Sequence, residues 1–174
     1  PNLPKLKSAL DKTRNVVAQS PRVRAAGLAY AHSKSLPCQI YGIDSARETA
    51  TTLLGKKILK GKLFESLPDS QGRVQALVGA QIADQLRLHP GESLALISQA
   101  ADGSVANDLF IVSGIVGTSD SYESQNIYLP LSAAQTFFAL EGKVHEWVLQ
   151  LSSFRNAKPV ARQLQGQLGD SFDV

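Results

Sequence analysis

The chain has 174 residues, of which 43% are hydrophobic and 19% charged, a balance that is typical of a globular protein and excludes a disordered chain. Lys and Arg total 18 against 15 Asp and Glu, a net charge of +3, and no basic run alternates with aromatic residues, so nucleic-acid binding is not indicated. The single cysteine, Cys38, lies in an apolar run and cannot form an internal disulfide or a cysteine-based metal site alone, so we expect it to be buried.

The N-terminal part of the sequence predicts a helix followed by two strands. Apolar residues repeat with helical spacing in residues 3–19, and Ser20-Pro21 ends the pattern. Two apolar runs, residues 23–30 and 36–43, predict the strands of a hairpin that turns at residues 32–35. The next segments are a short predicted helix in residues 44–54 and a lysine-rich stretch, residues 55–62, which predicts a solvated surface turn, with a lipid-headgroup or partner patch as the alternative.

The middle of the sequence predicts a mainly β region with two helices. A strand passes through Gly79 directly into a helix, and His89–Glu92 forms a turn. A later connection, residues 99–107, predicts a tight hairpin turn because Asp102-Gly103 tolerates positive φ. In chain order, the predicted elements are a strand at 74–78, a helix at 80–88, strands at 93–98, 108–116 and 127–129, and a helix at 131–140.

The two ends of the chain are predicted to fold together. A strand at residues 145–151 precedes a helix at 157–168, and a further strand is expected to begin at Phe172. The mixture of helices and antiparallel strands predicts an α+β class with two lobes. We expect residues 1–45 and 144–174 to form a discontinuous ferredoxin-like α/β lobe, and residues 46–143 to form an inserted, mainly β lobe with two helices. The residues expected to share one core between the terminal helices are Leu6, Leu10, Val17, Val160, Leu164 and Leu168.

The sequence offers no recognisable catalytic or cofactor motif. It contains no G-x-S-x-G elbow, phosphate loop or G-x-G-x-x-G fingerprint. The three histidines, His32, His89 and His145, are expected to lie far from one another, so we predict no metal site. Asp102 and its neighbours fit a hairpin tip better than a calcium loop, and residues 117–124 fit a solvated polar loop. We therefore predict a protein that is not an enzyme and carries no cofactor.

The two ends of the sequence predict a piece of a longer protein. The chain contains no methionine, begins immediately before a helical pattern and ends where a strand is expected to open. No apolar segment reaches the length that spans a bilayer. We expect a domain taken from a membrane-anchored protein.

Five segments, in order and at compatible spacing, resemble the MacB-like periplasmic core domain of FtsX-like ABC transporter permeases, a group that includes lipoprotein-releasing permeases. The resemblance covers roughly residues 3–170, and its most specific part is Ala76–Leu94, similar to a "vllG..lA..L....Gd.v" pattern. The other matching segments are Val17–Val23, Tyr41–Asp44, Phe110–Val116 and Ile127–Gln135.

The resemblance implies a place and a mode of action. Such a domain lies between the first and second of four transmembrane helices, at the extracytoplasmic, periplasmic face of the inner membrane. A cytoplasmic ATPase domain or subunit drives two copies of the permease, and the movement exports or releases a substrate or displaces a periplasmic partner protein. Candidate contacts with such a partner or substrate are Asp102, Ser104, Val105 and Tyr122.

One departure from the lipoprotein-releasing relatives bears on the partner. Their connection between the two strands after the glycine-led helix is lengthened into a hook that engages a lipoprotein carrier, whereas residues 99–107 are short and lack proline. A general export or mechanotransmission permease is therefore favoured over carrier recruitment. The alternative is a binding or sensing module that regulates a partner such as a cell-wall hydrolase without transport, and a hydrolase with an unrecognised site is a third hypothesis. The isolated domain is expected to be monomeric or weakly associated.

Overall fold

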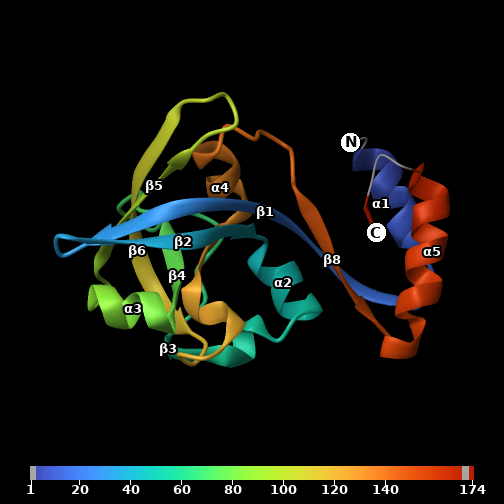
Figure 1. The fold of residues 1–174 in the computed structure, drawn as a ribbon, viewed down its shortest axis with the longest axis horizontal. Coiled ribbons are helices and arrows are strands. Elements are labelled where there is room, and N and C mark those ends of the chain that lie inside the picture. The colour runs from blue at the N-terminus through green and yellow to red at the C-terminus, as the bar shows by residue number, and fades with distance from the viewer. Residues whose placement is uncertain (1–2, 170–172) are drawn as a thin grey trace. The chain divides into compact units, whose positions relative to one another are not determined.

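The computed structural model describes residues 3–169 and 173–174 and has two compact units (Figure 1). The smaller unit comprises Pro1–Gln19 and Leu149–Val174, and the larger unit comprises Ser20–Val148. In the predicted division, residues 20–45 and 144–148 belonged to the lobe formed by the chain ends. The compact units instead divide the chain at 19/20 and 148/149. The lobe boundaries at 45/46 and 143/144 stay a prediction.

The strands join in a single mixed sheet in which six of them form a closed ring. Its order is β2-β7-β4-β6-β5-β1-β8, β3 pairs with β6, and an additional pairing of β1 with β2 closes the ring β1-β2-β7-β4-β6-β5. The strands are β1 (Val16–Ala31), β2 (Lys34–Ile43), β3 (Ile58–Gly61), β4 (Gln75–Gly79), β5 (Ser93–Gln99), β6 (Val105–Val116), β7 (Asn126–Pro130) and β8 (Glu146–Leu151).

Two predicted hairpins in the larger unit are confirmed. β1 and β2 are antiparallel, with Ala31 opposite Lys34, and the turn residues His32 and Ser33 both have positive φ (48° and 65°), as a type I′ turn requires. β5 and β6 are antiparallel, with Gln99 opposite Val105. Their connection is the tight turn expected from Asp102-Gly103, because Gly103 has φ +86° and the Ala100 amide donates to the Ser104 carbonyl oxygen.

Alternation along the strands places one side-chain set inside the ring and the other outside it. The inner set forms the main core together with α3 (Ala80–Leu86) and α4 (Leu131–Phe137). An outer cluster lies beneath α2 (Ser45–Thr51) and the 3-10 helix Leu54–Lys57. Members of the inner core include Val23, Ile40, Val78, Leu86, Leu96, Phe110, Leu129 and Phe138, and the outer cluster includes Tyr41, Ile43, Leu54, Leu77, Val116 and Tyr128.

The junction of β4 with α3 depends on Gly79. A Cβ at this position would lie 2.3 Å from the carbonyl oxygen of Ser124 and 2.4 Å from that of Glu123. Both atoms belong to backbone, which cannot turn aside as a flexible side chain can. Glycine therefore allows the strand to pass into the helix against the 122–125 segment, as the sequence predicted for this turn.

The smaller unit contains the pair of terminal helices. α1 (Leu3–Lys12) contacts α5 (Ala157–Leu168), and their inward residues Leu6, Leu10 and Leu164 are buried, as predicted. Val160 and Leu168 are buried as well, whereas Val17 is 63% exposed.

The structure corrects several predictions. The first helix ends at Lys12 instead of Gln19, because Asn15 adopts positive φ and the β-branched Val16-Val17 begins β1. Residues 58–61 form strand β3, whereas the lysine-rich sequence of residues 55–62 had predicted a surface turn. The strand forms by pairing with β6, which is distant in sequence and leaves no local signal. The ferredoxin-like description is not confirmed, because strands of both predicted lobes share one sheet. The strand predicted at Phe172 lies outside the described residues.

Candidate functional site

The outer face of β1, β2 and β7 carries a row of polar and aromatic side chains. β1 pairs antiparallel with β2, and β2 pairs parallel with β7, so residues opposite one another share a face. One cross-strand row contains Arg24, Tyr41 and Tyr128, and the next contains Ala26, Gln39 and Asn126. Because these positions point outward from the ring, this face is available for a polar network.

Tyrosine and asparagine side chains connect that network to a loop. Tyr41 stacks on Tyr128 with ring centroids 5.6 Å apart, and the Tyr41 and Tyr122 hydroxyls share a hydrogen bond. The Asn126 amide donates to the Tyr128 hydroxyl at 3.1 Å and to the Tyr122 carbonyl oxygen at 3.0 Å. The short 3-10 helix Tyr122–Gln125 is thereby fixed over the outer face of the sheet.

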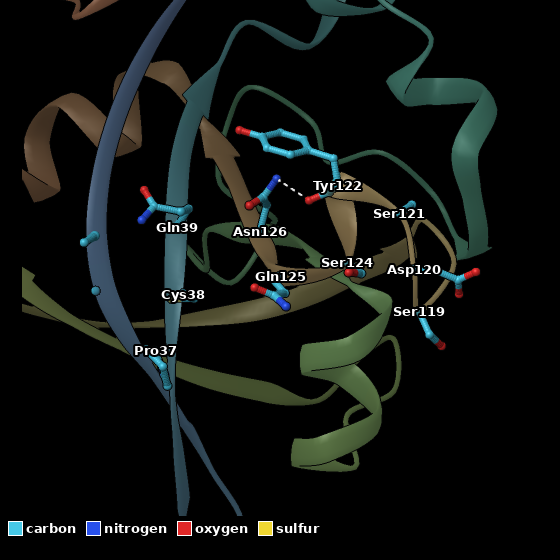
Figure 2. Close-up of a pocket in the computed structure, with 12 residues that line it drawn as sticks. Pro37, Cys38, Gln39, Ser119, Asp120, Ser121, Tyr122, Ser124, Gln125 and Asn126 are labelled. Atoms are coloured by element: carbon cyan, nitrogen blue, oxygen red, sulfur yellow. Dashed lines mark hydrogen bonds between the residues drawn. The ribbon is translucent and has the colours of Figure 1, made fainter.

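A first pocket of about 600 Å³ lies between this loop and the β1–β2 hairpin (Figure 2). The Tyr122 ring reaches back toward β2, whereas the Asp120 carboxylate points away from it. The lining contains no lysine or arginine, and Asp120 is its only carboxylate. The residues that line the pocket are Ala26, Gly27, Pro37, Cys38, Gln39, Ser119, Asp120, Ser121, Tyr122, Ser124, Gln125 and Asn126.

Burial raises the pKa of three groups in and beside this pocket, Cys38, Tyr41 and Tyr128. Burial raises the pKa of the Cys38 thiol to about 12, so the thiol stays protonated at neutral pH and is a poor nucleophile. Burial, followed by the hydrogen bond with Tyr122, raises the pKa of Tyr41 to about 12. Burial also raises the pKa of Tyr128. These three groups keep their protons at neutral pH.

A second pocket of about 600 Å³ contains three of the four predicted contact residues. Asp102, Ser104 and Val105 line it together with the aromatic side chains Phe110 and Phe137. The fourth, Tyr122, lines the first pocket instead. The Asp102 carboxylate accepts from the Ser104 hydroxyl at 2.7 Å and from the Ser104 amide at 3.0 Å. The structure thus places the predicted contacts in two different pockets, and their contact role stays a prediction.

Sequence reasoning missed a buried ion pair, Arg22 with Glu48, in the larger unit. The Glu48 side chain is only 1% exposed and forms a bidentate pair with the Arg22 guanidinium. Burial by itself would lower the pKa of Arg22. The hydrogen bond and the charge of Glu48 raise this pKa and together outweigh burial, so the net pKa is raised. Sequence carried one signal: Glu48 follows the helix N-cap Asp44 by four residues, at a helix position that faces inward.

Two histidines lie closer together than predicted. The His89 Nδ1 is 3.3 Å from one Glu92 oxygen, and the His32 Nε2 is 4.0 Å from the other. The reason is the pairing of β1 with β5, which sets Tyr30 opposite Ala95 and brings the β1–β2 turn beside Glu92. Within the described part of the chain, no group of three His, Cys, Asp or Glu side chains is placed to hold a metal ion.

None of the helices in the described residues combines the length and the apolar character needed to cross a membrane.

Comparisons with known proteins identify what the chain is similar to. A family model described as "MacB-like periplasmic core domain" matches residues 2–167. The extracellular domain of the noncanonic ABC-type transporter YknZ from Gram-positive bacteria has a similar structure, with a TM-score of 0.63 and 17% identity over 95% of this chain and 83% of that one. The periplasmic region of MacB from Actinobacillus actinomycetemcomitans gives a TM-score of 0.61 and 16% identity over 95% and 72%.

A domain of a putative permease protein from Porphyromonas gingivalis is also similar, with a TM-score of 0.52 and 11% identity over 96% of this chain and 69% of that one. A search of curated protein sequences found no match. At these identities the solved structures support the fold, and the family model supports the family.

Proposed function

The chain belongs to the family of MacB-like periplasmic core domains, and we propose that it couples ATP hydrolysis in the cytoplasm to the export or release of a substrate by changing conformation. The proposal includes a cytoplasmic ATPase domain or subunit, a second copy of the permease, and an extracytoplasmic position at the inner membrane. In this proposal the domain binds and moves but does not catalyse a reaction. The raised pKa of the buried Cys38 thiol makes this one residue a poor nucleophile.

The observation that carries the proposal is the way in which the chain passes between its two units. There are two passages, one between Gln19 and Ser20 and one between Val148 and Leu149. Both fall inside a strand, β1 and β8 respectively, and these strands are neighbours in the sheet. Hydrogen-bonded strands transmit a displacement better than flexible loops, so both passages suit mechanical coupling.

Flexible insertions at the passages test this proposal. Four residues, Gly-Gly-Ser-Gly, would be inserted after Gln19 and after Val148 in the full-length permease reconstituted with its ATPase in liposomes. We expect ATP hydrolysis to continue while substrate movement falls by at least about tenfold, because a flexible linker does not transmit displacement. The matched control carries the same insertion after Gln71, in the exposed turn between β3 and β4.

Undiminished transport with both passage insertions would contradict the proposal. ATP-dependent activation of a partner enzyme, without any substrate movement in the parent protein, would favour the regulatory alternative. Because the β5–β6 turn is short, we also expect a pull-down with a lipoprotein carrier to fail. Carrier binding that survives removal of the membrane helices would reverse that part of the proposal.

A further inference from the structure

One arginine lies close to both points at which the chain crosses between the two units. β1 enters at Ser20, and β8 leaves at Val148. Just inside these points, Arg22 on β1 contacts Glu48 on α2 and Glu146 on β8. All of these side chains belong to the larger unit, so their geometry can be described together.

The contact with Glu48 is a fully satisfied buried ion pair. The Arg22 Nε donates to Glu48 Oε2 at 3.1 Å, and Nη2 donates to Oε1. The Ser20 hydroxyl donates to Oε2 at 2.8 Å and the Thr52 hydroxyl donates to Oε1 at 2.9 Å. A carboxylate that is 1% exposed requires this degree of pairing, since an unpaired buried charge is strongly disfavoured. Arg22 therefore fixes the part of β1 just inside the larger unit on α2.

Other atoms of Arg22 contact the start of β8 and the residue before it. Arg22 Nη1 lies 3.7 Å from Glu146 Oε1, and the Arg22 carbonyl oxygen accepts from the His145 amide at 2.9 Å. Next to it, the Arg24 amide donates to His145 Nδ1 at 2.9 Å. The Glu146 pair is longer and more exposed than the Glu48 pair, with 36% of the Glu146 side chain exposed. The start of β8 is thus attached to β1 through Arg22, with charge attraction as one part of the attachment.

We propose that Arg22 is a positioning residue that joins the two passages into one junction with α2, so that a displacement carried by either strand reaches the larger unit through both. This inference rests on the proposed coupling function. Arginine suits the role because its planar guanidinium carries five N–H donors and reaches two carboxylates at once. Arg24 lies two residues further along the same face of β1, but its side chain is exposed and forms no hydrogen bond or ion pair in the described part of the chain.

A purely structural role and a positioning role make different predictions for paired substitutions. Arg22→Met alone leaves Glu48 buried without its partner and is expected to destabilise the fold. Replacing both members of a buried pair by apolar residues is often neutral. The double variant Arg22→Met/Glu48→Leu is therefore expected to recover the unfolding midpoint, yet it still lacks the contact with Glu146.

Hydrogen exchange of the His145 amide in the 174-residue chain, measured by NMR, tests the junction. This amide donates to the Arg22 carbonyl oxygen and reports whether β8 stays attached at its start. We expect exchange to become about two- to fivefold faster in Glu146→Gln and in Arg22→Met/Glu48→Leu, with little change in unfolding midpoint. Arg24→Met is the matched control and is expected to leave exchange unchanged. Exchange at the parent rate in Glu146→Gln would overturn the junction, whether or not the double variant folds.

The full-length permease provides the second readout. Glu146→Gln is expected to reduce substrate movement per ATP hydrolysed, whereas Arg24→Met is not. Normal movement per ATP in Glu146→Gln, together with faster His145 exchange, would overturn the role of the junction in coupling. A parent permease that moves no substrate would refute the proposed function, while the exchange result would still decide whether Arg22 joins the passages.

Discussion

The two units of this chain reach a folded core by different routes. The larger unit comes from the continuous stretch Ser20–Val148, and six strands close on one another around the inner core. The smaller unit is assembled from the two ends of the chain, and its described core rests on the pairing of α1 with α5. β1 and β8, which lead to the two helices, contact each other at Arg22 inside the larger unit. We therefore expect folding of the larger unit to lower the loop-closure cost of pairing α1 with α5.

The largest effect is expected from a cavity in the ring. Phe110 on β6 is 1% exposed, so Phe110→Ala should lower the free energy of unfolding by about 3–5 kcal/mol. The neighbouring Leu109 points outward and is 64% exposed, so Leu109→Ala should cost less than about 0.5 kcal/mol. Urea unfolding followed by circular dichroism measures both. Equal costs for the two variants would contradict the inside–outside assignment of β6.

A cavity between the terminal helices should have a more local effect. Leu164 on α5 is 1% exposed, and Leu164→Ala should weaken the helix pair by about 2–3 kcal/mol. Hydrogen exchange should then speed up in α1 and α5 but not in β4 and β6, because the ring does not depend on this pair. Gln163→Ala, at an exposed position of the same helix, is the control. Faster exchange throughout the ring would show that the two units unfold as one.

A smaller loss is expected at the turn from β4 into α3. Gly79→Ala would bring a Cβ within 2.5 Å of backbone atoms of residues 123–124, so the segment must shift. We expect the free energy of unfolding to fall by about 1–3 kcal/mol in urea titrations. Gly55→Ala offers a comparison, because the nearest atoms to its Cβ are those of the Thr49 side chain at 3.5 Å or more. If Gly55→Ala costs as much as Gly79→Ala, steric contact is not the cause.

The smallest effect concerns alkaline pH. The pKa of Cys38 is raised from 9.0 to about 12 in the folded chain, so between these values the unfolded chain loses the thiol proton and the folded chain keeps it. Stability is then fully present below pH 9 and falls as pH rises, by about 1 kcal/mol between pH 9 and pH 10. Cys38→Ala should remove this part of the decline in urea titrations at the two pH values. The same decline in parent and variant would assign it to other groups, such as Tyr41.

Local patterns predicted most elements of the larger unit, whereas long-range pairing was not predictable. The β1–β2 and β5–β6 hairpins and the Gly79 junction follow from residues close in sequence. The closure of the ring through β1 and β5 is a tertiary effect with no local signal. The predicted end of the first helix was wrong although a local signal was present. Val17 continues the helical spacing only by chance, and the β-branched Val16 and Val17 favour a strand.

The candidate site was predicted only in part. Asp102, Ser104 and Val105 share a pocket because they belong to one turn, which sequence could indicate. Tyr122 lies in the other pocket, where the fold sets the 122–125 segment against β2. The Arg22–Glu48 pair joins residues 26 positions apart. The position of Glu48 after its N-cap indicated an inward-facing side chain, but nothing in the sequence indicated Arg22 as its partner.

Strand β3 lies within the lysine-rich segment, residues 55–62, and has an edge that faces away from β6. Among the described strands β3 pairs with β6 alone, so its other edge is one on which a strand of another molecule could align. Lys57, Lys60 and Lys62 surround this short edge and are exposed, and Gly61 bends it with φ +70°. Like charges on two approaching copies repel, and a bent edge offers a poor template. We therefore expect Lys60 and Lys62 to hinder edge-to-edge pairing of two copies at β3, whereas the charge of Lys57 is paired with Glu123.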